Sequence, residues 1–150
     1  MITVIIAYIV NVASEHYENL LRQHRLRVTA VRLAVMEIIE NFPHSDTDFI
    51  IRQVRKNLGS VSTQAIYNVL ASLCDANLAR KIEPAGSSTL YELRVGDNHH
   101  HVVCRICKST QDIDCLIGER PCLHPNDTKG FLLDEAEITF WGICPICQSA

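Results

Sequence analysis

Apolar side chains in the first half of the chain recur at helical spacing. Between Thr29 and Pro43 they fall every three to four residues, with Thr29 as a good N-cap and Pro43 as a stop. A second helical segment begins near residues 45–48, which resemble a capping box, and extends to Gly59. A third helical segment begins near Ser62. The pattern therefore predicts a run of short, amphipathic helices.

Short strands are predicted after these helices. Two β-prone segments, residues 78–82 and 89–93, enclose a turn that contains Pro and Gly. Helices followed by a hairpin are the order of a winged helix-turn-helix, which we assign to residues 14–94. Residues 95–98 are interpreted as a hinge to a second domain at residues 99–150. The strands expected in that second domain are residues 101–104, 110–115 and 137–142.

Composition narrows the class of protein. The 150 residues are 47% hydrophobic and carry a net charge of −3, so a buried core is expected. That charge excludes nucleic-acid binding by overall positive charge, although it allows a local basic face. Residues 1–13 fit neither domain and are interpreted as an N-terminal arm or a start-site extension. Their apolar run is about half of the ~20 residues that a membrane span needs, so we expect a cytoplasmic protein without membrane association.

Cysteine spacing predicts a metal site. Six of the seven cysteines follow residue 100, and four of them form two C-x2-C pairs. These four are Cys104, Cys107, Cys144 and Cys147. Two such pairs complete a tetrahedron of soft thiolates, which suits a closed, structural zinc ion.

Other roles are open for some of the cysteines. Cys144 and Cys147 could instead serve a thiol-disulfide oxidoreductase, which needs a helix N-terminus after the first thiol. Because the given chain ends three residues after Cys147, we expect no such helix. Cys115 and Cys122 could form a disulfide, sense an oxidant or be unremarkable thiols. Cys74 is expected in the core.

Three consecutive histidines precede the first cysteine pair. On a strand, His99 and His101 point to one face and His100 to the other. Candidate oxygen ligands nearby are Glu92, Asp97 and Asp112. Imidazoles combined with carboxylates would favour Fe(II) or Mn(II) over a structural zinc ion. The alternative is a solvated histidine patch without a metal.

The polar face of the third helix has the residue types that contact DNA. This face carries Ser62, Thr63, Gln64, Tyr67 and Asn68. Such side chains hydrogen-bond bases and phosphates, and Tyr can pack against thymine methyl groups. Basic residues for phosphate contacts are Arg25, Arg27, Arg32, Arg80 and Lys81. The alternative is an ordinary solvated helix face.

These motifs, in this order, resemble the Fur (ferric uptake regulator) family of metal-dependent bacterial repressors over roughly residues 17–147. The stretches that carry the resemblance are residues 27–32, 61–70, 99–107 and 141–147. Residues 94–104 and 130–137 are most similar to the actinobacterial FurA/CatR branch. In that branch the regulator controls a catalase-peroxidase gene and often its own.

The resemblance implies an α+β fold, with an N-terminal winged helix-turn-helix domain followed by a small α/β dimerisation domain. It implies a homodimer that binds double-stranded DNA at an A/T-rich palindrome, and a repressor rather than an enzyme, with no small organic cofactor. The structural zinc ligands would be the four cysteines above. The regulatory Fe(II) or Mn(II) ligands would be His44, Glu92, His99, His101 and Asp112. The DNA-binding residues would be Arg27, Thr29, Arg32 and the five polar residues of the third helix.

Two ligands indicate different signals within this family. Asp112 matches the peroxide-sensing branch, in which Fe(II) and peroxide oxidise a ligand histidine and release DNA. Glu92 matches the iron-sensing branch instead. We favour a peroxide-responsive repressor of catalase-peroxidase or iron and oxidative-stress genes, because the FurA/CatR branch has the most similar sequence. A plain iron-sensing repressor and a zinc- or nickel-sensing relative are the alternatives.

Overall fold

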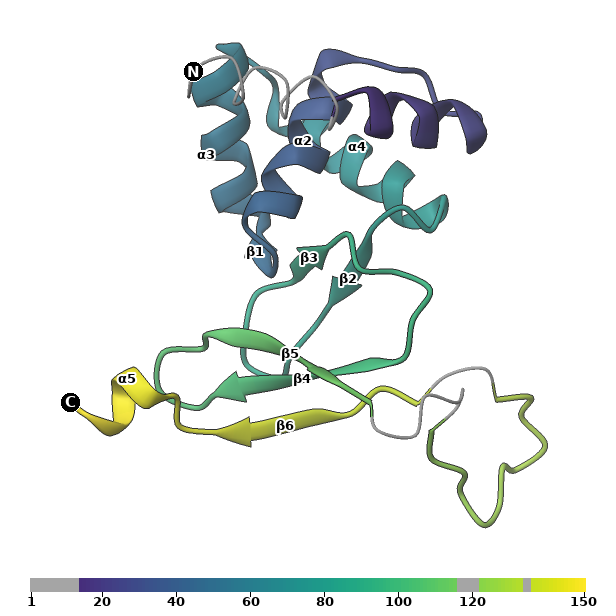
Figure 1. The fold of residues 1–150 in the computed structure, drawn as a ribbon, viewed down its shortest axis with the longest axis vertical. Helices are drawn as coiled ribbons and strands as arrows, with labels where there is room; N and C mark the ends of the chain where they lie inside the picture. The colour runs from purple at the N-terminus through teal and green to yellow at the C-terminus, as the bar shows by residue number, and fades with distance from the viewer. Residues whose placement is uncertain (1–13, 116–121, 134–135) are drawn as a thin grey trace, which may run out of the picture. The chain divides into compact units, whose positions relative to one another are not determined.

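The computed structural model describes residues 14–115, 122–133 and 136–150, so the interpretation of residues 1–13 lies outside the described part. The chain forms two compact units (Figure 1). The first comprises Met1–Glu83 and Ser88–Val95, and the second comprises Pro84–Ser87 and Gly96–Ala150. No helix among the described residues is long and apolar enough to cross a membrane.

The helices of the first unit begin at the capping residues that the sequence predicts. Residues 14–23 are helical, and three further helices follow: α2 (Ala30–Asn41), α3 (Thr47–Leu58) and α4 (Thr63–Asp75). The side chain of Thr29 accepts a hydrogen bond from Arg32 N at 3.3 Å, and that of Ser62 accepts one from Ala65 N at 3.1 Å. Gly59 ends α3 with φ of +79°, a conformation that favours glycine. The predicted helix boundaries are therefore confirmed.

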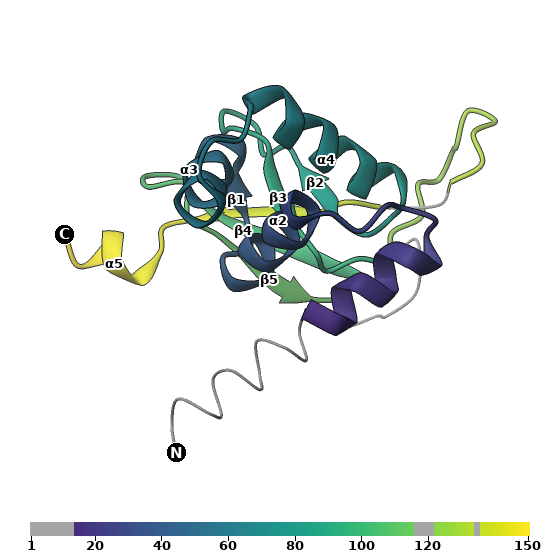
Figure 2. The ribbon, with the colours of Figure 1, turned by 90° about the horizontal axis from the view of Figure 1, so that it is seen from above.

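One apolar core holds these helices together. α2 packs against both α3 and α4 (Figure 2). The fully buried side chains of this core include Leu21, Val35, Ile39, Ile50, Val54, Ile66 and Leu73. These are the apolar positions of the helical pattern, so amphipathic spacing defines the core face of each helix.

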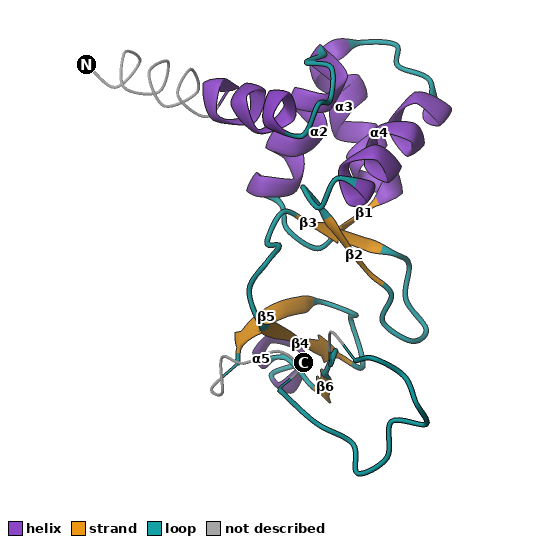
Figure 3. Ribbon diagram, turned by 90° about the vertical axis from the view of Figure 1, so that its right-hand side faces the viewer, coloured by secondary structure: helices purple, strands orange, loops and turns teal. Residues whose placement is uncertain are grey.

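The wing of the first unit is a three-stranded sheet (Figure 3). β2 (Arg80–Ile82) and β3 (Leu90–Glu92) are antiparallel, as the sequence predicts. β3 also pairs with β1 (Ser45–Asp46), which gives the order β1-β3-β2. Sequence patterning did not predict β1, because two residues are too few to display alternation. This pairing places the loop before α3 beside the end of the wing.

The second unit is built on a different sheet. Its strands are β4 (His99–Cys104), β5 (Thr110–Asp114) and β6 (Thr139–Gly142), in the order β5-β4-β6. β4 is antiparallel to β5 and parallel to β6. β4 begins two residues earlier than predicted, so all three consecutive histidines lie within it. The α+β fold class is confirmed.

The expectation that no helix follows Cys144 was wrong. α5 (Pro145–Gln148) is a single helical turn, and Cys144 is its N-cap residue. Proline is well tolerated at the first helical position, where its missing N–H has no helical partner to lose. Four residues suffice for this turn, so the few residues after Cys147 did not preclude it.

Candidate metal centres and DNA-contacting helix

The four cysteines of the C-x2-C pairs converge in the second unit. Cys104 lies at the end of β4, where parallel pairing sets it opposite Gly142 of β6. A tight turn after β4, with Lys108 at φ of +63°, brings Cys107 back toward Cys104. Cys144 and Cys147 bracket the first turn of α5. Sheet pairing thus joins two knuckles that lie 36 residues apart in the sequence.

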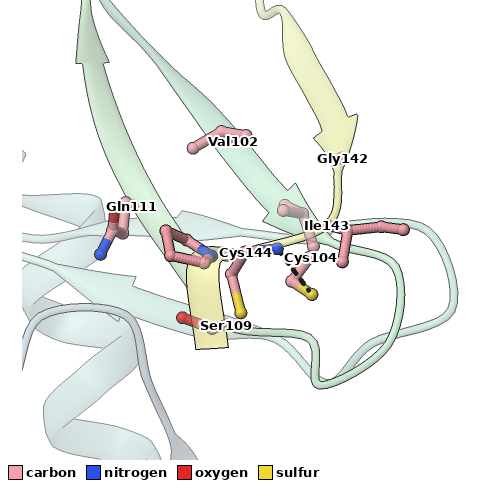
Figure 4. Close-up of a pocket in the computed structure, with 9 residues that line it drawn as sticks. Val102, Cys104, Ser109, Gln111, Gly142, Ile143 and Cys144 are labelled. Atoms are coloured by element: carbon pink, nitrogen blue, oxygen red, sulfur yellow. Dashed lines mark hydrogen bonds between the residues drawn. The ribbon is translucent and has the colours of Figure 1, made fainter. Parts of the chain in front are cut away.

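The geometry of these thiols fits one zinc ion. All four sulfur atoms lie within 4.8 Å of one another, and the sulfur atoms of Cys107 and Cys144 are 3.7 Å apart. Zn–S bonds of ~2.3 Å at tetrahedral angles separate two sulfur atoms by about 3.8 Å. The backbone N–H of Cys144 donates to Cys104 Sγ at 3.4 Å, beside a cavity of about 150 Å³ (Figure 4). Four cysteine sulfur atoms would fill all four positions of a tetrahedral zinc ion, which leaves no position open to water.

Electrostatics in this cluster also suit a cation. Backbone N–H groups of Cys144 and Cys107 donate to Cys104 and lower the pKa of its thiol to about 6. Hydrogen bonds from the neighbouring cysteines, first Cys144 and then Cys107, raise the pKa of Cys147 to about 12. The Cys104 thiol is thus poised to ionise, whereas the Cys147 thiol resists adding negative charge beside it. A divalent cation would relieve this repulsion and bind all four thiolates.

A second group of donors lies on one face of β4. The antiparallel register places His101 directly opposite Asp112 of β5. Asp112 Oδ1 lies 3.5 Å from His101 Nε2 and 4.0 Å from His99 Nε2. The two imidazole rings meet edge to face at 4.9 Å. The structure therefore brings together three of the five predicted regulatory ligands within the second unit.

Asp97 takes a different position from the one expected of a ligand. Its Oδ1 lies 2.7 Å from His99 Nδ1, whereas the Nε2 atom of His99 faces Asp112. A carboxylate on the second ring nitrogen fixes the orientation and tautomer of a metal-binding histidine. Asp97 is thus placed to orient His99 rather than to bind the same ion.

The other two predicted ligands meet in the first unit. His44 Nε2 lies 3.2 Å from Glu92 Oε2, and both side chains are buried. His44 has φ of +60°, and its backbone N–H donates to the carbonyl oxygen of Tyr91 at 2.9 Å. The short β1–β3 ladder therefore aligns His44 with Glu92. Periodicity gave no signal for His44, because it lies in the loop between α2 and β1; only the family resemblance identified it.

The polar face of α4 is exposed as predicted. All five of its candidate DNA-contacting residues are exposed, whereas Ile66, Val69 and Leu70 on the other face are buried. Tyr67 is 45% exposed. Gln64 Nε2 donates to Asn68 Oδ1 at 2.8 Å, so these two amides are held side by side. The helix presents polar groups outward and anchors itself by apolar groups inward.

Several of the predicted DNA-binding residues also have structural partners. The hydroxyl groups of Thr29 and Ser62 cap α2 and α4, and Arg32 Nη1 donates to the carbonyl oxygen of Arg27 at 2.7 Å. The sequence pattern did not indicate Arg55, which donates hydrogen bonds to Val61 O and Thr63 Oγ1, both at 2.9 Å. This arginine braces the loop that leads into α4. No local pattern marked it, because its partners lie six and eight residues away.

Comparison with known proteins gives consistent matches. Residues 23–140 match the ferric uptake regulator family. The chain is 54% identical over 132 residues to the transcriptional regulator FurA of Mycobacterium tuberculosis (strain ATCC 25618 / H37Rv), covering 88% of this chain and 90% of that one. It is 48% identical over 125 residues to the ferric uptake regulation protein 1 of Mycolicibacterium fortuitum, covering 83% and 78%.

A solved structure matches the fold. The Helicobacter pylori ferric uptake regulator Fur superposes with a TM-score of 0.68 over 94% of this chain and 95% of that one. The two sequences are 16% identical, so this likeness bears on the fold alone.

Proposed function

The chain belongs to the ferric uptake regulator family, and from that premise we propose that it is a metal-dependent, peroxide-responsive repressor. Regulators of this family control transcription, respond to metals, bind operator DNA and act as dimers, and they are not enzymes. For this chain we further propose the type of operator, the two kinds of metal, the residues that bind them and the peroxide signal. The observation that carries it is the pairing of Asp112 with His99 and His101 on one face of β4.

In this proposal α4 is the helix that enters the major groove. Its five exposed polar residues contact bases and phosphates, and Arg27, Thr29 and Arg32 contact the backbone. A homodimer in the cytoplasm binds an A/T-rich palindrome, since two-fold symmetry in the protein matches two half-sites. Exposed apolar side chains of the second unit, such as Ile113 and Phe140, support dimerisation through that unit.

The proposal assigns different metals to the two donor sets. The four cysteines suit structural Zn(II), because soft thiolates fill a closed tetrahedron. The imidazoles and carboxylates of His44, Glu92, His99, His101 and Asp112 suit Fe(II) or Mn(II). His44 and Glu92 belong to the first unit, and the three other ligands belong to the second. A shared ion would therefore favour the conformer in which the dimer fits DNA.

The peroxide response follows from the donor atoms. The ligand set would hold Fe(II), which would supply redox catalysis for hydrogen peroxide without a net loss of electrons from the metal. The imidazole C–H of His44, His99 or His101 would become C–OH by taking one oxygen atom of the peroxide, and the other oxygen atom would leave as water. The oxidised ring is a poorer ligand, so the two units lose their common partner and the DNA-competent conformer becomes less populated.

An operator-binding assay tests this proposal. Zinc-reconstituted protein is loaded without oxygen with Fe(II) or Mn(II) and titrated onto a fragment that carries an A/T-rich palindrome. We expect metal-dependent binding in both forms, and loss of binding after micromolar peroxide in the Fe(II) form only. Peptide mass spectrometry should locate one added oxygen atom on His44, His99 or His101.

A matched pair of variants adds a control. His99→Ala should fold and keep its zinc but lose metal-dependent operator binding, whereas His124→Ala, which changes an exposed histidine, should behave like the wild type. Fe(II)-dependent binding that resists peroxide would replace the proposal with an iron-sensing repressor. Operator binding that does not depend on Fe(II) or Mn(II) would overturn the assignment of the regulatory ligands.

A further inference from the structure

The face of β4 opposite His99 and His101 carries a second kind of donor set. His100 points to that face, as strand alternation predicts, and its Nε2 lies 3.3 Å from Cys122 Sγ. Cys115 follows the end of β5 by one residue. The donor atoms of His100, Cys115 and Cys122 all lie within 4.8 Å of one another. Two thiols and an imidazole thus converge from three separate segments of the second unit.

The surroundings of these three donors are those of a built site. His100 is 5% exposed and Cys122 is 8% exposed, and Cys115 is half-buried. Cys122 also hydrogen-bonds the Cys115 thiol and the side chain of Asn98. Burial keeps most of the water away from His100 and Cys122. Two thiols beside an imidazole form a donor set that suits a soft or borderline cation.

The distances agree with a common metal ligation geometry. Zn–S bonds of ~2.3 Å and Zn–N bonds of ~2.0–2.1 Å at tetrahedral angles separate sulfur from nitrogen by about 3.5 Å. The observed separation of 3.3 Å between His100 and Cys122 is close to that value. Two thiolates and one imidazole are soft or borderline ligands, which select zinc over iron(II), manganese(II) or magnesium.

We propose that His100, Cys115 and Cys122 bind a zinc ion that is separate from both metal centres described above. Among the described residues this site has three donors, and water or another small ligand would take the fourth coordination position. It differs from the four-cysteine cluster, which is closed, and from the His99–Asp112 face, which lacks sulfur. The proposed repressor mechanism does not use His100, Cys115 or Cys122. The test of this zinc site is therefore independent of the test of that mechanism.

The ion would tie three segments of the second unit. It would hold Cys122 to the end of β5 and to the start of β4. Because Cys115 and Cys122 are seven positions apart in the sequence, their joint ligation closes a short loop at a small entropic cost. The site would thus stabilise a unit in which few apolar side chains are buried.

A disulfide between Cys115 and Cys122 is the competing reading. Its formation removes two protons and two electrons from the thiols, and hydrogen peroxide would accept them to give two waters. The structure favours the metal because His100 lies within contact distance of Cys122, and a disulfide has no need of an imidazole partner.

Cobalt(II) titration in the presence of reductant distinguishes these readings. The full-length protein is first given one equivalent of zinc to fill the four-cysteine cluster, and Co(II) is then added. Sulfur-to-cobalt charge-transfer absorption reports only sites with thiolate ligands, so the histidine and carboxylate centre does not contribute to it. We expect this absorption in the wild type and in the matched control Cys74→Ser, and its loss in Cys115→Ser and Cys122→Ser.

A wild-type measurement guards against a variant that fails to fold. Protein loaded with ¹¹³Cd should give a resonance for a site with two sulfur ligands in addition to that of the four-sulfur cluster. Absence of both the charge-transfer band and this resonance in reduced protein would overturn the site. Peptide mapping of protein prepared without added metal should find no Cys115–Cys122 disulfide. Such a disulfide would favour the competing interpretation. Persistence of the band in both serine variants would equally count against the assignment.

Discussion

The two units of this chain are stabilised in different ways. In the first unit, helices and wing enclose a continuous apolar core that includes Leu21, Ile39, Ile50 and Leu73. In the second unit, Val103 is the one buried residue among the described Val, Ile, Leu, Phe and Trp side chains. What the second unit buries instead includes three histidines and two cysteines.

This difference indicates where each unit obtains its stability. Apolar burial contributes about 25 cal/mol per Å², so the continuous core is a main source of stability for the first unit. The second unit exposes large apolar side chains such as Phe131 and Leu132 and buries groups that prefer ligands. Small domains with so little core usually need a metal or a partner subunit. We therefore expect the second unit to draw its stability from a bound metal or a partner subunit.

The largest effect should follow from removing a thiol of the four-cysteine cluster. Cys104→Ser should lose zinc and the cooperative unfolding of the second unit, because structural zinc supplies roughly 10–16 kcal/mol of binding free energy in small domains. Metal analysis and calorimetry measure both losses. Cys74→Ser is the control, since Cys74 belongs to α4 of the first unit. A Cys104→Ser protein with unchanged zinc and melting would break the comparison between the units.

Truncating a core side chain of the first unit should lower the free energy of unfolding without changing the zinc content. Leu70 is 1% exposed, and Leu70→Ala should lower the free energy of unfolding by about 2–5 kcal/mol through lost burial and a residual cavity. Urea denaturation measures this loss, and zinc content should stay the same. Loss of zinc in this variant would mean that the two units do not draw on separate sources of stability.

A smaller effect is expected on DNA binding from the exposed face of α4. Tyr67→Ala should weaken operator binding by about 1–3 kcal/mol if the ring contacts a base, with little change in stability. Fluorescence anisotropy on the operator fragment measures this. Tyr67→Phe separates the contribution of the hydroxyl group from that of the ring. Wild-type affinity in Tyr67→Ala would remove this residue from the proposed DNA-binding set.

The smallest effect concerns a helix cap. Asp46 Oδ1 accepts a hydrogen bond from Phe49 N at 2.7 Å at the start of α3. Asp46→Ala should destabilise the first unit by about 0.5–2 kcal/mol, whereas Asp46→Asn should cost less because Asn also caps well. Thermal unfolding followed by circular dichroism compares the two. Equal losses would show that the charge, rather than the cap, carries the effect.

The parts of the site that local chemistry defines were predictable. The C-x2-C spacing indicated the four-cysteine cluster, and alternation along β4 separated His99 and His101 from His100. These inferences worked because the relevant contacts follow from a period of two or a spacing of three. His44 had no such signal, because a two-residue strand aligns it with Glu92. Arg55 was missed because its partners lie six and eight residues away, outside the spacings of a helical or strand pattern.

The sequence by itself determined the helices, their caps, the fold class and which four thiols form the cysteine cluster, since these depend on neighbouring residues. Only the tertiary structure decided that Asp97 orients His99 through its second nitrogen, and that Cys115 and Cys122 lie with His100. Such groupings depend on strand register and on how loops return to a sheet. Register is set by packing across the whole unit, which no local pattern encodes.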